Sequence, residues 1–364
     1  MQSGPVDSRK ERLNHLLLMR FGDRPLPCTV VVGGFFGDSG KGKVISYLAL
    51  KDRPEIAARA GVGPNAGHTV VWEGRTYKMR MLPSAFVSPE TRLLLGPGVL
   101  VDPELTLREI ALTGVGQRVG IDYQCAVIEP AHRAQDAGSE HLAKVIGTTG
   151  TGCGPANVDR VMRVGRLCRD VPELQGMLTD VPLEINRALD LGKNILVEGT
   201  QGTFLSLYHG TYPFCTSKDV TASAACADVG VGPRRVDEVI AVFKSYVSRV
   251  GQGPLEDELS PDEAERRGWA EIATVTGRRR RAAPFNFELA KRAVMLNSAT
   301  SLAITKLDAI DKRCAGVRRF EDLTDEAKSF VRLVQDELRR PVTLLGTGPS
   351  AEEMIDLRQS SAAW

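Results

Sequence analysis

The chain has 364 residues, of which 42% are hydrophobic and 25% are charged, the balance of a globular protein with a large buried core. Its 47 lysines and arginines nearly cancel its 45 aspartates and glutamates, which leaves a formal charge of +2. This balance excludes the global basic field that attracts nucleic acid or an acidic membrane surface, so neither is expected as a partner.

Residues 1–27 are predicted to form an N-terminal arm. Their Leu-rich stretch at 16–19 is flanked by acidic residues, and no segment of the chain approaches the roughly 20 apolar residues that span a bilayer. The seven cysteines are odd in number and lack C-x-x-C spacing, which indicates reduced thiols rather than disulfides or a zinc site. These features predict a cytoplasmic protein in which residues 28–364 form a single domain.

Short apolar runs alternate with helical patterns along the rest of the chain. This alternation predicts an α/β fold with a mostly parallel central sheet, flanking helices and insertions. Strands are expected at 29–33, 92–95, 124–128, 194–197, 239–242, 301–306 and 342–345. Several of these runs end in glycine-rich or polar loops, where open α/β sheets bind ligands. The charged segment 254–269 is expected to be an exposed excursion.

The first strand leads into the segment VVVGGFFGDSGKGKVI, residues 30–45, which holds five glycines and two lysines. This pattern predicts a strand, a phosphate-binding loop and a helix, because glycines let backbone N–H groups approach an anion and lysines add charge. Residues 37–43 have the G-x-x-x-x-G-K spacing of a Walker A loop, but Val44 replaces its magnesium-binding Ser or Thr. Asp38 lies inside the loop, where a carboxylate indicates a metal ligand or a base.

Three further segments carry candidate polar groups. His68 follows the small-residue loop 61–67 and is either structural or catalytic, and the close backbone approach that small residues allow favours catalysis. The loop 147–155 holds four glycines and three threonines, a composition that suits a phosphate as well as a flexible surface loop. Gln201 follows a buried run, and its amide can both donate to and accept from a base edge.

Two charged motifs lie closer to the C-terminus. Residues 278–281 are four consecutive arginines behind a Thr-Gly turn, and arginine forks match carboxylates and phosphates. A nucleic-acid or targeting patch is the alternative, which the near-neutral charge and the lack of neighbouring aromatics disfavour. Lys306 and Asp308 close a buried strand, where an aspartate can accept from guanine N1 and N2 while the lysine stem covers the ring.

Taken in order, these segments resemble one family, adenylosuccinate synthetase. The resemblance runs from about residue 30 to residue 357. It is carried by the motifs FGDSGKGK, GPNAGHTVV, GTTGTGCGP, VEGTQGT, HGTYPFCTS, SRVGQGP, TGRRRR, TKLD and GTGP. Any one of these could arise by chance, but so many in the family's order do not.

The resemblance implies a homodimeric α/β ligase related in architecture to P-loop GTPases. Such enzymes use Mg²⁺ and a nucleoside triphosphate to phosphorylate the 6-oxygen of a purine monophosphate, and the amine of L-aspartate then displaces the phosphate. The substrates are therefore small molecules. The sequence leaves the donor open among GTP, ATP and dATP.

The resemblance also assigns roles to individual residues. The catalytic residues are Asp38, which takes the N1 proton, His68, which stabilises the transferring phosphoryl group, and Lys41. The rest of the phosphate loop is Gly37, Ser39, Gly40, Gly42 and Lys43. Asp38 and the Gly67 carbonyl match the family's magnesium ligands. Contacts to the purine monophosphate are matched by Asn65, Thr148, Thr149, Arg163, Gln201 and Thr216. The L-aspartate loop is matched by Thr274, Val275, Thr276, Gly277, Arg278 and Arg280. The donor-nucleotide site is matched by Lys306, Asp308, Gly346, Gly348 and Pro349.

Some positions depart from the family's pattern. Ser39 replaces a usual Glu, Ser350 replaces an Asp, and a shortened arginine-rich stretch leaves Arg163 or Arg160 as the residue that crosses the dimer interface. A serine beside the purine gives room and an acceptor for a 2-amino group, as in a viral branch of the family that acts on dGMP, although that branch often replaces the Asp that is Asp38 here. We therefore predict (d)GMP as the acceptor, with IMP as the alternative. A GTPase or nucleotide sensor without ligase activity is the alternative from another class.

Overall fold

The computed structural model describes residues 27–273 and 277–359. Within them a ten-stranded sheet has the order β16-β15-β14-β11-β1-β10-β2-β5-β7-β9, and only β16 is antiparallel to its neighbour. The strands of this sheet are β1 (Cys28–Gly33), β2 (Ile56–Arg59), β5 (Arg92–Leu95), β7 (Val119–Asp122), β9 (Leu178–Thr179), β10 (Ile195–Glu198), β11 (Glu238–Lys244), β14 (Ser301–Thr305), β15 (Val342–Gly346) and β16 (Met354–Asp356). The predicted α/β class and mostly parallel sheet are confirmed.

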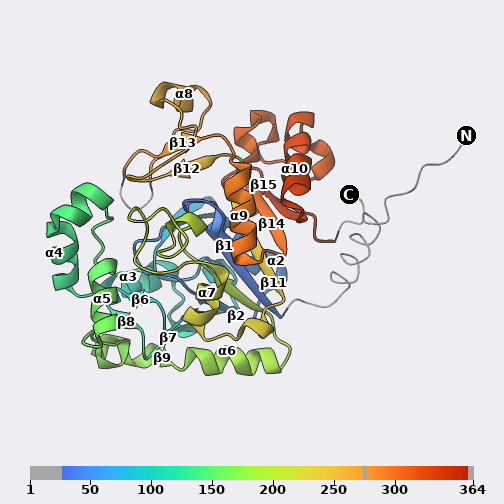
Figure 1. Cartoon of the computed structure of the whole chain (residues 1–364). Helices are drawn as coiled ribbons and strands as arrows, with labels where there is room; N and C mark the ends of the chain where they lie inside the picture. The colour runs from blue at the N-terminus through green and yellow to red at the C-terminus, as the bar shows by residue number, and fades with distance from the viewer. Residues whose placement is uncertain (1–26, 274–276, 360–364) are drawn as a thin grey trace, which may run out of the picture.

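Helices cover both faces of the sheet (Figure 1). They are α2 (Lys41–Asp52), α3 (Pro103–Thr113), α4 (Pro130–Gly138), α5 (Cys153–Met162), α6 (Val181–Asp190), α7 (Ala222–Val229), α8 (Pro261–Arg266), α9 (Phe287–Asn297) and α10 (Asp325–Leu338). Shorter turns are 3-10 at Ser84–Val87, Gly116–Arg118, Cys168–Asp170, Pro172–Met177, Thr203–Leu205, Pro233–Arg235, Leu307–Ala309, Lys312–Cys314 and Phe320–Asp322, and π-helical at His141–Ile146.

The alternation of side chains along β1 explains the two faces. Val31 packs in one core cluster with Val44 and Ile45 of α2. Val30 and Val32 point the other way and pack in a second cluster with residues of α6 and α7. Successive side chains of a strand leave on opposite faces, so an apolar run without alternation is a strand buried on both sides.

Three pairs of short strands lie outside the main sheet. They are β3 (His68–Trp72) with β4 (Arg75–Met79), β6 (Leu100–Val101) with β8 (Ala126–Val127), and β12 (Val247–Arg249) with β13 (Arg281–Ala283). The prediction of a main-sheet strand at 124–128 was wrong, because only residues 126–127 form a strand, β8, and it pairs with β6 outside the main sheet. The main sheet instead takes β7, and Asp122 then closes a turn by accepting from the backbone N–H of Gln124 at 2.8 Å.

Other expectations are mostly met. Six of the seven predicted strands lie within a residue or two of strands in the main sheet, although Lys306 leaves β14 with a φ of 64°. Segment 254–269 is largely exposed. The exceptions are Ala264, which is buried, and Trp269, whose ring stacks on that of Tyr246 with 4.6 Å between the ring centres. All seven cysteines are free thiols. No helix in the described ranges is long and apolar enough to cross a membrane.

Gly34 offers a test of the packing behind the phosphate loop. A Cβ at this position would lie 2.0 Å from the ring of buried Phe243. Gly34→Ala should therefore lower the free energy of unfolding by about 1–3 kcal/mol, as overpacked cores do. Gly138 ends α4, and a Cβ there would meet no atom within 4 Å, so Gly138→Ala is the matched control. Denaturant titration checks both, and equal stabilities would contradict the prediction.

Candidate active site

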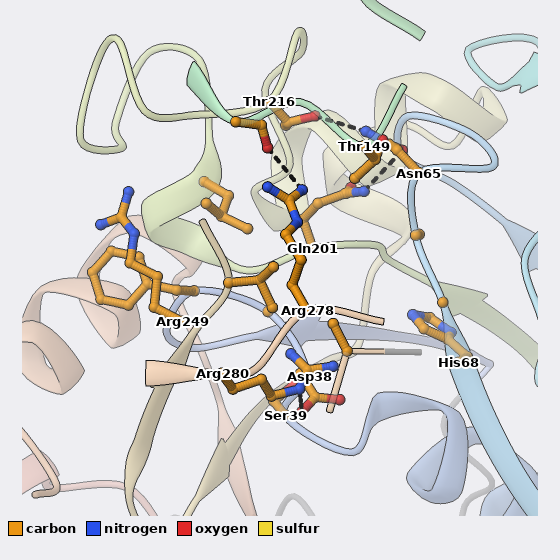
Figure 2. Close-up of a pocket in the computed structure, with 18 of the residues that line it drawn as sticks. Asp38, Ser39, Asn65, His68, Thr149, Gln201, Thr216, Arg249, Arg278 and Arg280 are labelled. Atoms are coloured by element: carbon orange, nitrogen blue, oxygen red, sulfur yellow. Dashed lines mark hydrogen bonds and ion pairs between the residues drawn. The ribbon is translucent and has the colours of Figure 1, made fainter. Parts of the chain in front are cut away.

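A cavity of 710 Å³ opens at the carboxyl ends of the central parallel strands. It is lined by residues that follow β1, β10, β11, β14 and β15, together with the loops at 65–69 and 146–154. Figure 2 shows that the labelled side chains converge on this cavity from several of these segments. Ligands bind at this edge in open α/β sheets, and the polar lining agrees with that rule.

The loop between β1 and α2 forms one wall of the cavity, as the sequence predicted. The Lys41 ammonium donates to the Gln201 carbonyl, and the Lys43 ammonium donates to the carbonyls of Gly348 and, at 2.7 Å, Glu353. Burial lowers the pKa of both lysines to about 8. Each ammonium is therefore held by backbone oxygens at the edge of a cavity that an anion can enter.

Asp38 belongs to a cluster of five charged side chains. Its Oδ2 accepts from Lys244 Nζ at 2.6 Å and lies 3.1 Å from Arg280 Nε. Glu271 also accepts from Lys244, and its other oxygen lies 3.2 Å from Lys306 Nζ. Burial acts to raise the pKa of Glu271, but these cations, Lys244 first, outweigh it and lower that pKa to about 2. The cluster joins the phosphate loop to the segments predicted to bind L-aspartate and the donor.

His68 lies at the start of β3 with its ring in a buried polar network. Nδ1 contacts Glu198 Oε1 and lies 2.7 Å from Arg59 NH1. Burial, followed by the charge of Arg59, lowers the pKa of His68 to about 4, so the ring is neutral near pH 7. Glu198 is ionised, because Arg59, His68 and Ser84 outweigh the effect of burial and lower its pKa to about 2.

A chain of amides and hydroxyls lines the opposite side of the cavity. Gln201 Nε2 donates to Asn65 Oδ1 at 3.0 Å, and Asn65 Nδ2 donates to Thr216 Oγ1 at 3.1 Å. Arg278 reaches the loop predicted to bind phosphate, where it donates to the carbonyls of Gly147 and Thr148 at 2.9 and 3.0 Å. These groups offer both donors and acceptors to the edge of a base.

Most of the predicted site residues line this one cavity. Those that do are Gly37, Asp38, Ser39, Gly40, Lys41, Gly42, Lys43, Asn65, Gly67, His68, Thr148, Thr149, Gln201, Thr216, Arg278, Arg280, Lys306, Gly348 and Pro349. Thr274, Val275 and Thr276 lie outside the described residues.

Four predicted residues do not line the cavity. Gly277 is exposed, and Gly346 is the last residue of β15. Asp308 is half-buried. Arg163 follows α5 and is exposed, so the contact with the purine monophosphate predicted for it is not made within this chain.

Several residues at the site escaped the sequence analysis. Glu198, Arg59 and Lys244 each end a strand of the main sheet, and that position was the available signal. Arg249 is fully buried and donates to Thr211 Oγ1 at 2.8 Å, with its guanidinium 4.4 Å from the ring centre of Phe36. Arg249 lies in the motif SRVGQGP, but that motif does not show that its guanidinium contacts Phe36 and Thr211, which are distant in sequence.

The donor set for a metal ion is small. Within the described ranges no three His, Cys, Asp or Glu side chains are grouped to hold an ion. Asp38 and Gly67 both line the cavity and offer a carboxylate and a backbone carbonyl. These hard oxygens fit Mg²⁺, which binds through one or two carboxylates and completes its shell with substrate phosphates and water.

A family model described as adenylosuccinate synthetase matches residues 30–172 and 166–314. The chain is 55% identical to the adenylosuccinate synthetase of Archaeoglobus fulgidus, over 91% of this chain and 98% of the relative. It is 54% identical to that of Methanocaldococcus jannaschii, over 92% and 97%. This chain belongs to the adenylosuccinate synthetase family. It is accordingly a carbon–nitrogen ligase of purine biosynthesis.

Two solved structures share the fold. Adenylosuccinate synthetase from Plasmodium falciparum has a TM-score of 0.85 at 22% identity, over 91% of this chain and 99% of that one. Succinoaminodeoxyadenylate synthetase of cyanophage S-2L, bound to dGMP and dATP, has a TM-score of 0.75 at 26% identity, over 92% and 96%. The much higher identity to the archaeal synthetases does not support the predicted preference for dGMP and favours the IMP alternative.

The two loop lysines predict a pH dependence of phosphate binding. Lys41 and Lys43 have pKa values of about 8, and an anion bound beside them favours their ammonium forms. Below pH 8 both charges are already present, whereas above it binding must take up protons. Affinity for a nucleoside triphosphate should therefore fall between pH 8 and 9, by at most about tenfold for each lysine.

Titration calorimetry in two buffers of different ionisation enthalpy measures this proton uptake. Lys41→Gln is the matched variant and should remove one lysine's share of the uptake. Binding that takes up no protons at pH 9 would contradict the prediction.

Proposed function

We propose that the chain joins L-aspartate to C6 of IMP with GTP as the phosphoryl donor, through a 6-phosphoryl intermediate. The single observation that carries the proposal is that Asp38, His68, Lys41, Gln201 and Arg280 converge on one cavity in a chain of this family. Figure 2 labels four of these side chains around that space.

Asp38 is suited to remove the N1 proton of the purine. Both of its cationic partners contact Oδ2, and Oδ1 makes no hydrogen bond within the described part of the chain. Oδ1 is therefore the oxygen that can accept the N1 proton. Loss of the N1 proton to Asp38 places negative charge on the 6-oxygen, which then attacks the γ-phosphorus of GTP as the bond from that phosphorus to the β,γ-bridging oxygen breaks and GDP leaves.

Other residues handle the phosphoryl group and the amine. Lys41 and the loop N–H groups hold the donor phosphates, and His68 contacts the transferring group. Mg²⁺, held by Asp38 and the Gly67 carbonyl, supplies charge neutralisation at the phosphates when bound. Arg278 and Arg280 bind the carboxylates of L-aspartate, whose amine forms the new bond to C6 as the C6–O bond to phosphate breaks.

The position of Ser39 supports IMP over dGMP. The side chain is 2% exposed, and its hydroxyl oxygen is inaccessible to solvent, with no hydrogen-bond partner among the described residues. Its backbone carbonyl accepts from Thr305 Oγ1 at 2.8 Å, which ties the residue to β14. A hydroxyl buried in this way does not present an acceptor to a purine 2-amino group.

Asp308 supports guanine as the base of the donor. Its Oδ1 is buried and lacks a hydrogen-bond partner in the described ranges. A carboxylate oxygen accepts hydrogen bonds, so a base that reaches Asp308 has to supply donors. Guanine offers N1–H and the 2-amino group on one edge, whereas adenine presents an acceptor at N1.

Steady-state turnover with L-aspartate and Mg²⁺ tests the proposal directly. IMP, GMP and dGMP are compared as acceptors, each with GTP and with ATP. We expect kcat/KM for IMP with GTP to exceed that of every other pair by about tenfold or more. Preference for dGMP would contradict the proposed acceptor.

Two variants accompany this measurement. Asp38→Asn should lower kcat by about 10²–10⁴-fold, because the amide cannot take the N1 proton. Ser39→Glu should leave the ratio of IMP to dGMP turnover unchanged.

We further propose that the protein acts as a homodimer through an apolar patch on α5. Val158, Val161, Met162 and Val164 are between 59% and 72% exposed. Clustered exposed hydrophobic residues mark interaction surfaces. Arg163 lies within this patch, so a two-fold contact brings it towards the site of the other subunit.

Val161→Asp should dissociate the dimer and lower turnover at dilute enzyme. Leu191, which follows α6 and is 75% exposed, gives the matched control Leu191→Asp, for which no change in assembly is expected. Light scattering measures the mass of both variants. A wild-type monomer would contradict the proposed assembly.

A further inference from the structure

Arg59 and Glu198 form an ion pair that is almost completely removed from solvent. Their exposed fractions are 1% and 0%, and Arg59 NH1 donates to Glu198 Oε1 at 2.7 Å. The two residues are paired across neighbouring parallel strands, β2 and β10, at the last position of each. Sheet register therefore fixes the pair at the carboxyl ends of these strands, in contact with His68, which lines the cavity.

Buried ion pairs are costly unless further hydrogen bonds satisfy them. Glu198 meets this condition. Oε2 accepts from the Ser84 backbone N–H at 2.6 Å, and Oε1 accepts from the Ser84 hydroxyl at 2.7 Å. The remaining contact of Oε1 is with His68 Nδ1. Three donors that take no part in the proposed reaction therefore hold the Glu198 carboxylate, namely Arg59 NH1, the Ser84 backbone N–H and the Ser84 hydroxyl. Its fourth contact is with His68.

Two neighbours make opposite demands on His68 Nδ1. Glu198 is ionised and can only accept, so its contact requires a proton on Nδ1. Arg59 can only donate, so its contact at 2.7 Å requires a bare Nδ1. A bare nitrogen would place its lone pair against a carboxylate oxygen, and two acceptors that face each other repel. The guanidinium proton also has Glu198 as an alternative acceptor.

We propose that Glu198 is the positioning residue for His68: it holds the proton of the neutral ring on Nδ1 and directs Nε2 into the cavity. The role of the ring in phosphoryl transfer rests on the proposed function. The placement of the ring itself rests only on the contacts of Glu198, Arg59 and Ser84. Partners of this kind orient functional imidazoles in other proteins, and their loss costs about 10–100-fold in activity.

Packing against α2 also restricts the position of the His68 ring. A Cβ at Gly42 in the first turn of α2 would lie 2.8 Å from the Cβ of His68 and 3.1 Å from Ser84 Oγ. Helix α2 therefore packs directly against His68 and Ser84. Nε2 makes no hydrogen bond within the described ranges, and His68 lines the cavity. It is the ring atom available to a ligand.

The test uses the full-length protein labelled with ¹⁵N-histidine, without ligands, at pH 8. Nitrogen chemical shifts distinguish protonated from bare ring nitrogens, and His68→Gln identifies the signals of this ring among the five histidines. We expect the wild-type proton on Nδ1. A proton on Nε2 alone would show that Arg59 sets the ring and would overturn the proposal.

Glu198→Gln provides the second measurement. Its amide can donate to Nδ1, so the proton should move to Nε2, and kcat should fall about 10–100-fold with KM values little changed. Unchanged shifts and unchanged kcat in this folded variant would also overturn the proposal. If the variant does not fold, the wild-type tautomer alone decides.

Ser84→Ala is the matched control. It removes one hydrogen bond to Glu198 without touching His68 and keeps the carboxylate. We expect it to retain the proton on Nδ1, because the Glu198 carboxylate is still present, whereas a shift of the proton to Nε2 would count against Glu198 as the deciding group. A wild-type protein with the proton on Nδ1 but no ligase activity would refute the proposed function and leave the ring placement standing.

Discussion

Every strand of the main sheet except β16 runs in one direction, so the residues that follow these strands meet at a single edge. The charged side chains of the site lie at this edge, where the backbone and most side chains are buried. A buried charge needs a partner, and in the absence of ligands these charges satisfy one another or bind backbone carbonyls. Lys41 binds the Gln201 carbonyl, while Lys244 bridges Asp38 and Glu271.

The site consists of two networks with different roles. The Arg59–Glu198–Ser84 network is sealed and anchored to strand ends, so it suits the fixed placement of His68. The network around Asp38 is more open, with Asp38 29% and Lys306 44% exposed. It joins the loop at 37–43 to the segments predicted to bind L-aspartate and the donor. A ligand that draws Lys306 away from Glu271 would change the charge balance around Asp38, so these segments are electrostatically connected.

Specificity for the acceptor illustrates how a residue type can mislead. A serine at position 39 satisfies the chemical requirement for contact with a 2-amino group, yet the fold buries its hydroxyl beneath the loop. The adjacent Asp38, whose backbone is left-handed with a φ of 48°, keeps its side chain 29% exposed. Side-chain chemistry and side-chain direction are separate properties, and the second is decided by the path of the loop.

The sequence by itself determined the fold class, the strand, loop and helix around residues 30–45 and most of the cavity lining, because these depend on local patterns. Apolar runs give buried strands, and glycines with lysines before a helix give an anion site. Only the tertiary structure revealed Lys244, Glu271, Arg59 and Glu198 as parts of the site, since each acts through a partner distant in sequence. It also showed that β7, and not segment 124–128, pairs with β5 in the main sheet. Arg163 lies away from the cavity of the chain that carries it. Such outcomes depend on sheet register and on packing between segments, which no local pattern encodes.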